Sequence, residues 1–248
     1  INTIFWNPAG LSQLRQSQLS FMHNEGLVNT QYEFLGFAHP TEEMGTVAAS
    51  IIYLHQGKIV QRSVNGYTTG DFISYDTAFN FSYGNNVSKT LSFGFNLKLI
   101  KQQIAHISAS GMAFDFGTLY QTPIENLNIS ATLQNAGPGI TFVQEETPLP
   151  TKLSFGVAYN IKGLILAADF NLPRDAQPYF NIGTECLFGE IFALRSGLIS
   201  QKDLAVPTAL SYGFGLQYNN YGLDYAFLPF GELGNTHRIS MNFKFGSR

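Results

Sequence analysis

The chain has 248 residues, with 14 Lys plus Arg against 17 Asp plus Glu. The formal net charge of -3 excludes the basic stripe expected of a nucleic-acid-binding protein. Only 12% of the residues are charged, whereas there are 22 Phe, 12 Tyr and 24 Gly, and soluble domains carry about twice that charged fraction. This composition predicts a large surface that water does not cover.

Several functional classes lack support in the sequence. No run of 18 or more apolar residues occurs, which excludes a transmembrane helix. The single cysteine, Cys186, excludes an internal disulfide framework and a CxxC metal or redox pair. The five histidines lack the spacing of a metal-binding motif. We therefore predict no metal site, no cofactor and no enzymatic activity; an outer-membrane lipase or protease is the minor alternative.

The first 16 residues, INTIFWNPAGLSQLRQ, form a segment before the first strand and contain the only tryptophan, Trp6. Asn7 to Gly10 reads as a turn, because Asn favours turn initiation, Pro8 fixes its φ angle and Gly10 tolerates left-handed geometry. Residues 11–15 are predicted to form a short helix.

The rest of the chain alternates apolar and polar residues with a period of two and shows little helical periodicity. A transmembrane strand needs about 9 to 11 residues, and most of the alternating segments have about that length. The fourteen predicted strands lie at residues 17–24, 29–38, 46–55, 74–84, 89–100, 107–121, 126–134, 151–160, 163–171, 177–187, 190–200, 208–219, 221–228 and 236–246.

Alternation alone does not say which face is wet. In residues 90–98, TLSFGFNLK, the side chains of Leu91, Phe93, Phe95 and Leu97 share one face. Ser92, Asn96 and Lys98 lie on the other face. The apolar face turns inward in a soluble sheet and toward lipid in a membrane barrel.

The connections between strands alternate in length. Tight turns follow even-numbered strands at 85–88, 122–125, 162–163, 189–190 and 219–220, and longer connections follow odd-numbered strands at 56–71, 135–150 and 228–236. Short turns on one rim and long loops on the other are typical of outer-membrane barrels, in which the short turns are periplasmic.

Aromatic residues near the ends of even-numbered strands support this interpretation. Tyr83, Tyr120, Tyr159 and Tyr218, with Phe188, are predicted to form an interfacial belt. The sequence thus predicts an all-β protein, a transmembrane up-and-down antiparallel β-barrel of about 14 strands in a bacterial, Gram-negative-type outer membrane, with both termini periplasmic. A soluble β-sandwich or propeller is the alternative fold.

The same register predicts which side chains face the lumen. Most of them are Gly, Ala, Ser and Asn, which leaves room for a plug, and we divide the chain into a plug segment, 1–16, and a barrel, 17–248. Structural pairing across the wall is favoured over a selectivity or proton-relay role for the charged ones. These are Asp76, Lys98, Asp115, Asp169, Glu185, Arg195, Asp224 and Lys244.

A family resemblance adds to this interpretation. FWNPAGL at residues 5–11, with YEFLGFAHP, LQNAGPGITF and LPTKLSFGVAY further on, resembles the FadL-like outer-membrane proteins, especially the PorV/PorQ branch. The resemblance implies a fourteen-stranded barrel with the N-terminal segment lodged inside it. It also implies a plugging or gating role for Trp6, Asn7, Pro8, Ala9 and Gly10; a structural turn that merely starts the first strand is the alternative.

Two functions are compatible with this resemblance. The PorV branch implies an accessory or cargo-binding component of a protein export system similar to type IX secretion. Its partners would be outer-membrane lipid and a translocon subunit or cargo signal domain, contacted through the long connections 56–71 and 135–150. The alternative is a FadL-like channel for hydrophobic small molecules such as fatty acids, with a hydrophobic ligand or detergent in the lumen. We expect few large apolar residues inside the barrel to form such a ligand site.

Overall fold

The computed structural model describes residues 1–189, 191–200, 208–231 and 234–246. In this part of the chain, helix α1 (Thr3–Trp6) and 3-10 helix η1 (Pro8–Gln13) precede a closed sheet, and a short 3-10 helix, η2 (Leu27–Asn29), follows the first strand. The barrel strands are β1 (Ser17–Glu25), β2 (Thr30–Thr41), β3 (Gly45–Arg62), β4 (Thr68–Asn86), β5 (Leu91–Ile104), β6 (Ile107–Gln121), β7 (Leu127–Ala136), β10 (Lys152–Ile161), β11 (Leu164–Pro173), β12 (Tyr179–Phe188), β13 (Phe192–Ser200), β14 (Thr208–Tyr218), β15 (Tyr221–Pro229) and β16 (Asn235–Phe245).

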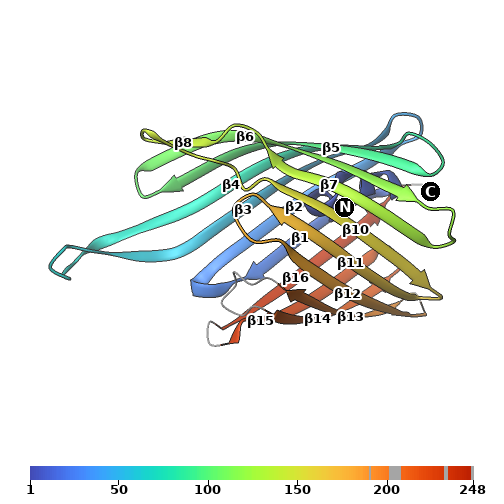
Figure 1. The fold of residues 1–248 in the computed structure, drawn as a ribbon. Coiled ribbons are helices and arrows are strands. Elements are labelled where there is room, and N and C mark those ends of the chain that lie inside the picture. The colour runs from blue at the N-terminus through green and yellow to red at the C-terminus, as the bar shows by residue number, and fades with distance from the viewer. Residues whose placement is uncertain (190, 201–207, 232–233, 247–248) are drawn as a thin grey trace.

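Each strand pairs antiparallel with its neighbours in the chain, except that β7 pairs with β10. The short strands β8 (Ile140–Phe142) and β9 (Glu145–Thr147) form a separate hairpin between these two. The barrel closes where β1 meets β16, in a register that runs from Ser17 opposite Phe245 to Glu25 opposite His237. Figure 1 shows the closed wall with both chain ends at the same rim. The predicted up-and-down barrel of fourteen strands is confirmed.

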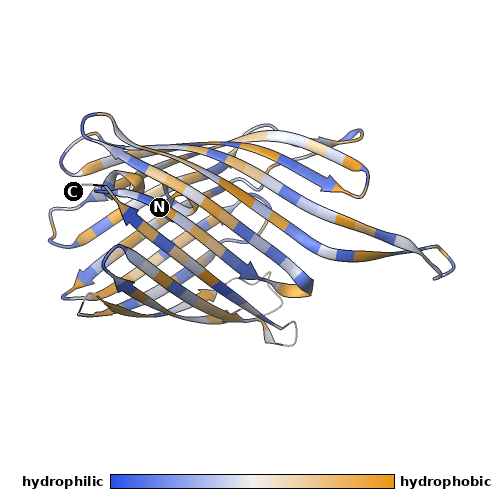
Figure 2. Ribbon diagram, turned by 180° about the vertical axis from the view of Figure 1, so that it is seen from behind, coloured by the Kyte–Doolittle hydropathy of each residue, from blue (hydrophilic) through white to orange (hydrophobic). Residues whose placement is uncertain are grey.

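The two faces of the wall are inverted relative to a soluble protein. On β5, Leu91 and Phe93 are each 37% exposed, whereas Ser92 retains 7% and Asn96 none of its surface. Alternating hydrophobic and hydrophilic residues follow the strands around the barrel (Figure 2). The apolar residues of β5 therefore point outward, as predicted, and the alternative of a soluble sandwich is wrong. No helix in the described residues is long and apolar enough to cross a membrane.

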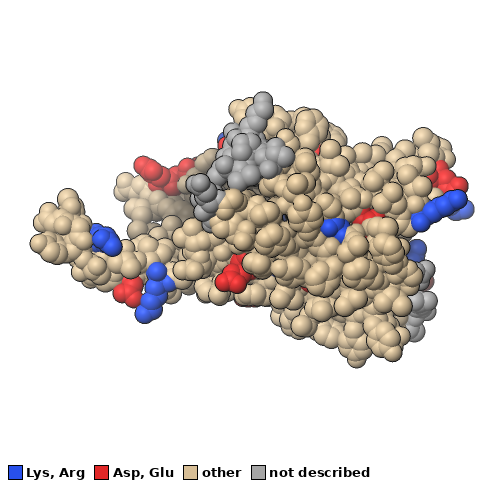
Figure 3. Space-filling model, turned by 90° about the horizontal axis from the view of Figure 1, so that it is seen from below, with Lys and Arg blue, Asp and Glu red and all other residues tan. Residues whose placement is uncertain are grey.

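The predicted aromatic belt lies on the outer face near one rim. Tyr83, Tyr120, Tyr159, Tyr218 and Phe188 are all exposed and stand within the last few residues of their strands. We call this edge of the barrel the terminal rim, because it carries both chain ends and the short turns that follow even-numbered strands. We call the opposite edge the far rim. Charged side chains are few over the middle of the wall in Figure 3. This distribution suits a wall with lipid around its middle.

The connection predicted at 56–71 is mostly strand. β3 and β4 continue as a two-stranded ribbon, residues 57–73, that projects beyond the far rim (Figure 1). The turn at its tip is closed by hydrogen bonds between Ser63 and Tyr67 and between Gly66 and Ser63. Asn65-Gly66 at this turn is a strong hairpin signal, which the interpretation by loop length overlooked.

The connection predicted at 135–150 is also ordered. It contains the β8–β9 hairpin, which contacts β6, so it is not irregular throughout; its role as a partner-contact surface stays a prediction. The predicted turn 189–190 and connection 228–236 are described except for residues 190, 232 and 233, and the last two residues of the predicted barrel domain also lie outside the described part.

Phe81 provides a test of the outward assignment, since it is 54% exposed on the outer face of β4. We expect Phe81→Arg to lower the free energy of unfolding in lipid by about 1–2 kcal/mol, because a charged side chain then faces hydrocarbon between the interfacial Tyr83 and the midplane. Asn181→Arg is the matched control, because residue 181 faces the lumen directly opposite Asp169. Urea titration of the heat-modifiable gel shift measures both variants, and equal losses would contradict the assignment.

Candidate functional site

The N-terminal segment lies inside the barrel against the inner faces of β4, β5 and β6 (Figure 1). Pro8, Ala9 and Leu11 of η1 are buried there. The chain thus enters the lumen at the terminal rim before it turns back into β1.

Asn7 sets the conformation of this segment. Its Oδ1 accepts a hydrogen bond from the backbone N–H of Ala9 at 3.0 Å, and Pro8 occupies the first helical position, where its missing N–H costs nothing. The Nδ2 of Asn7 donates to the carbonyl of Thr118 on β6 at 3.0 Å. The predicted turn is therefore the start of a 3-10 helix, and the helix predicted at 11–15 begins earlier, at Pro8.

A row of three glycines forms the floor beneath this helix. Gly84, Gly94 and Gly117 lie directly opposite one another on β4, β5 and β6. A Cβ on Gly84 would lie 2.7 Å from the carbonyl oxygen of Pro8, a Cβ on Gly94 would overlap the Pro8–Ala9 backbone, and one on Gly117 would overlap the amide oxygen of Asn7. The helix can lie on the wall because these residues have no side chains.

Gly10 has a related role that the sequence did not reveal. It is absent from the described glycines with positive φ, so the predicted left-handed geometry is wrong. Instead, a Cβ at Gly10 would lie 2.7 Å from Cγ2 of Thr3. Glycine is needed here because η1 packs closely against α1.

Apolar contacts hold the other side of the segment. Ile4 and Leu11 are buried together with Ala38 and Ala48 of the wall. The ring of Phe5 lies 4.5 Å from the ring of Phe34, between centroids, and 6.2 Å from that of Tyr32. Trp6, by contrast, is 63% exposed, so the buried contacts come from its neighbours.

Two amide side chains of the wall fix the backbone of α1. Nδ2 of Asn96 donates to the carbonyl of Ile4 at 2.8 Å, and Nε2 of Gln134 donates to the carbonyl of Phe5 at 2.6 Å. The same Nδ2 of Asn96 also donates to Oδ2 of Asp115 at 2.9 Å, and Nζ of Lys98 lies 2.7 Å from that oxygen. The predicted lumen charges Lys98 and Asp115 therefore form a buried pair beneath the segment.

A second charged cluster lies on the other side of the lumen. Arg195 of β13 binds Glu185 of β12 and, through Nη1, Asp224 of β15 at 2.6 Å. Asn242 donates to the other oxygen of Asp224 at 3.1 Å. The Arg195–Asp224 pair passes over Gly215, where a Cβ would lie 2.6 Å from Oδ1 of Asp224. The predicted structural pairing across the wall thus exists for Glu185, Arg195 and Asp224.

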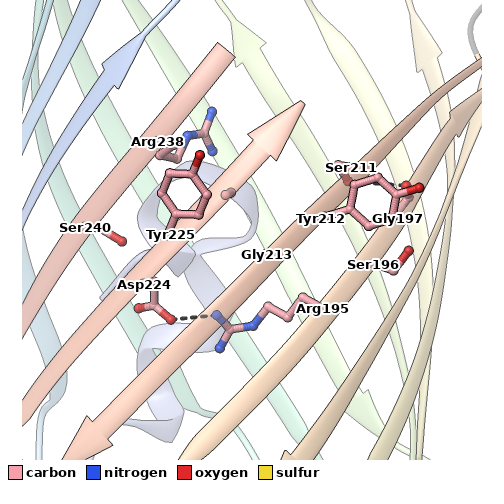
Figure 4. Close-up of a pocket in the computed structure, with 11 residues that line it drawn as sticks. Arg195, Ser196, Gly197, Ser211, Tyr212, Gly213, Asp224, Tyr225, Arg238 and Ser240 are labelled. Carbon is pink, nitrogen blue, oxygen red and sulfur yellow. Dashed lines mark hydrogen bonds and ion pairs between the residues drawn. The ribbon is translucent and has the colours of Figure 1, made fainter. Parts of the chain in front are cut away.

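Arg195 and Asp224 of this cluster line a pocket of about 250 Å³ that also includes Ser211, Arg238 and Ser240. Figure 4 shows Arg195 directed toward Asp224, with Arg238 and Ser240 on the neighbouring strand β16. Among the described residues, Arg238 has no hydrogen-bond or ion-pair partner. Arg238 therefore adds a positive charge to the lining of this pocket.

The two sides of the lumen differ in hydration. Asp115 and Asn96 are fully buried beneath the N-terminal segment, whereas the Arg195 and Asp224 side chains are 40% and 30% exposed. The segment therefore fills the lumen beside β3–β6 and leaves the β12–β16 side accessible to water.

Among the described residues, the remaining predicted charges make no ion pair with these two clusters. Asp76 accepts a hydrogen bond from Gln102 at 3.1 Å. Asp169 lies opposite Gly156 and Asn181, and Lys244 lies opposite Gln18. Within the described part of the chain, no three His, Cys, Asp or Glu side chains are grouped as a metal site.

Large apolar side chains inside the lumen were missed by the sequence interpretation. Phe34 is only 3% exposed and contacts Phe5, and the strand register places four further residues on the same inner face. We name these five residues the lumen apolar patch: Met22, Tyr32, Phe34, Ile52 and Leu54. The stretches YEFLGFA and ASIIYL are apolar on both faces, so alternation gave no orientation here.

The glycine row yields a prediction. Gly94→Ala should displace the N-terminal segment, because the new Cβ overlaps the Pro8–Ala9 backbone. Gly183→Ala is the control, since the nearest atom to a Cβ at that strand position is 3.9 Å away. Trp6 is the only tryptophan, so its fluorescence anisotropy reports on the segment and should fall in Gly94→Ala alone. Unchanged anisotropy in a folded Gly94→Ala barrel would refute the role of the row.

Comparison with known proteins gives different results for sequence and for structure. No protein-family model matches the chain, and no curated protein matches it by sequence. Among solved structures, the toluene transporter TodX of Pseudomonas putida is similar over 97% of this chain and 91% of its own, with 13% identity and a TM-score of 0.70.

Two further structures are similar to the same extent. The monoaromatic hydrocarbon channel CymD covers 99% of this chain and 93% of its own, with 14% identity and a TM-score of 0.71. A FadL homologue from Pseudomonas aeruginosa covers 98% and 94%, with 9% identity and a TM-score of 0.66. At these identities the likeness establishes the fold: this chain has the barrel fold of hydrocarbon channels and a FadL homologue.

Proposed function

We propose that this barrel is a FadL-type channel that admits small hydrophobic molecules across a bacterial outer membrane. The observation that carries the proposal is the lumen apolar patch. Ion pairs and amides suffice to line a water-filled pore, so clustered large apolar side chains inside the wall need another explanation. A hydrophobic substrate is the simplest one, because ligand sites of this kind are mostly apolar with a few polar groups.

The patch is continuous across three strands. Met22 lies opposite Phe34, and Phe34 lies opposite Ile52. Tyr32 and Leu54 form a second opposed pair on the same face. Directly opposed side chains have Cβ atoms about 4.5–5.5 Å apart, so the five form one surface. The ring of Phe5 already lies against it, so the surface accommodates an aromatic ring.

Arg238 would allow the proposed site to bind amphipathic molecules as well. It lies opposite Asn24 on β1, which in turn lies opposite Tyr32 on β2. Two strand spacings place the Arg238 backbone about 10 Å from that of Tyr32. A molecule such as a fatty acid could thus place its apolar chain on the patch and its carboxylate at the guanidinium.

The fold shared with the toluene transporter TodX and with CymD supports a channel for hydrophobic compounds. The orientation follows the general rule for such barrels, in which short turns are periplasmic. We therefore infer that the terminal rim and both chain ends face the periplasm and that the far rim faces the cell exterior.

Binding of toluene and of decanoate to the purified barrel, measured by calorimetry below the micellar range of decanoate, tests the proposal. Ile52→Asn should weaken both ligands about tenfold, because it removes an apolar contact worth about 1.5–3 kcal/mol. Arg238→Gln should weaken decanoate about tenfold or more, since a hydrogen bond to a charged group contributes about 1.5–3 kcal/mol, and should spare toluene.

Two controls separate these effects from general damage. Ile165→Asn changes a lumen side chain on β11, opposite Glu185, and should leave both affinities unchanged. Arg62→Gln removes an arginine from the ribbon and should not affect decanoate. If neither ligand binds the wild-type barrel, or if the two isoleucine variants behave alike, the channel proposal fails.

The ribbon favours a second function, the accessory role in protein export. Residues 57–62 of β3 extend past the last pair with β2, and residues 68–72 of β4 extend past the hydrogen bond from the N–H of Ala105 to the carbonyl of Ile73. Both edges of the ribbon therefore offer unpaired backbone groups, to which a partner strand can add. A translocon subunit or a cargo signal domain would be the partner.

Shortening the ribbon tests this second role. Replacement of residues 58–70 by Asn-Gly should abolish cross-linking to translocon subunits or cargo in the native envelope, because it removes both free edges, and should preserve the heat-modifiable gel shift. A parallel variant with Val143→Ser, on the β8–β9 turn, should keep the cross-links. Recovery of the same cross-links from the shortened protein would exclude the ribbon as the partner site.

A further inference from the structure

The connection between β7 and β10, residues 137–151, folds into the lumen, and we call it the inner strap. Ile140 and Leu149 are buried with Ala109 and Ala113 of β6. Ile140 lies directly over Gly111, where a Cβ would approach its Cγ1 to 2.6 Å. These β6 residues belong to the same face as Gly117, so the strap covers the lumen wall near the far rim while η1 covers it near the terminal rim.

The strap is organised internally. Ile140, Thr141 and Phe142 pair with Thr147, Glu146 and Glu145, and Oε1 of Glu146 accepts the N–H of Gly139 at 3.0 Å. These contacts make the hairpin one structural unit.

Asn135 joins the strap to the wall with four polar groups. Its Nδ2 donates to the carbonyl of Pro150 at 3.2 Å, and its carbonyl accepts from Oγ1 of Thr151 at 3.0 Å. Its Oδ1 accepts from Nζ of Lys98 at 2.7 Å, and its N–H donates to Oδ1 of Asp115 at 2.8 Å. Asn135 has a φ of 55° at a bulge opposite Asp115, a conformation that Asn tolerates.

The same buried pair holds the N-terminal segment. Asn96 connects Asp115 to the carbonyl of Ile4, and Gln134, next to Asn135 in the bulge, binds the carbonyl of Phe5. A continuous path of hydrogen bonds therefore runs from Ile4 through Asn96, Asp115 and Asn135 to Pro150. Removal of one partner of a buried ion pair leaves an uncompensated charge. Because Asn96 and Asn135 both contact the Lys98–Asp115 pair, we expect these contacts to rearrange together.

We propose that Asn135 couples the N-terminal segment to the inner strap, so that the two coverings of the lumen open and close together. When the segment leaves the glycine row, Asn96 and Gln134 lose their carbonyl acceptors, and the bulge is free to reorient. Reorientation of Asn135 then releases Pro150 and Thr151 at the base of the strap. The coupling does not depend on which molecule passes through the lumen.

Labelling of a single cysteine in the strap tests the coupling. In a Cys186→Ser background, Ile140→Cys provides a buried thiol, and Gly94→Ala displaces the segment, as Trp6 anisotropy verifies independently. We expect a polar maleimide to label Cys at residue 140 about tenfold faster when the segment is displaced, which is within the usual range of allosteric coupling. Equal labelling rates with a displaced segment would overturn the proposal.

The route through Asn135 has its own control. Asn135→Gly removes the side-chain amide and keeps the positive φ without strain, so Gly94→Ala should no longer accelerate labelling in this variant. Asn126→Gly makes the same change at a φ of 62° in the turn before β7 and should preserve the acceleration. An acceleration that survives Asn135→Gly would exclude Asn135 as the connection.

Coupling must also act in reverse, because linkage is reciprocal. In the Cys186→Ser background, Gly111→Cys with Ile140→Cys places two Cβ atoms 3.8 Å apart, a typical disulfide separation. With Gly94 kept, oxidation should lock the strap and raise Trp6 anisotropy by holding the segment in place, and reduction should lower it again. Anisotropy that ignores the disulfide would contradict the proposal.

Discussion

The structure depends on one constraint, namely that the backbone groups of a sheet in lipid must be satisfied within the sheet itself. The pairing of β1 with β16 meets it by removing the edges of the wall. Once the sheet is closed and its apolar residues face outward, polar and small residues must face inward. Buried asparagines, a buried aspartate and exposed phenylalanines, which would be defects in a soluble protein, follow from this closure.

Within the lumen the same constraint produces two different environments. The side under the N-terminal segment is dry, so its charges are paired and its amides bind backbone carbonyls, as Asn96 and Asp115 do. The side lined by β12–β16 is more exposed, and among the described residues Arg238 has no hydrogen-bond or ion-pair partner there. Next to it lies the lumen apolar patch, where the ring of Phe5 is packed. A buried support, a more exposed charged surface and an apolar surface thus share one lumen.

The strands could be predicted from the sequence because most of them have one apolar and one polar face. Leu91 to Lys98 is a clear example, and the strand positions agree with the structure within a few residues except at the extended hairpin of β3 and β4.

The glycine row could not be predicted, because its role depends on the strand register: Gly84, Gly94 and Gly117 are far apart in sequence and meet only when three strands align. The lumen apolar patch was missed because β2 and β3 are apolar on both faces. The contacts of Asn135 depend on a bulge that period-two alternation does not reveal.

The position of the N-terminal segment also constrains the order of assembly. The segment is continuous with β1, yet it rests on β4, β5 and β6, which are synthesised later. It therefore cannot reach its final contacts until those strands are aligned. The filling of the lumen thus depends on the alignment of β4, β5 and β6, on which the segment rests.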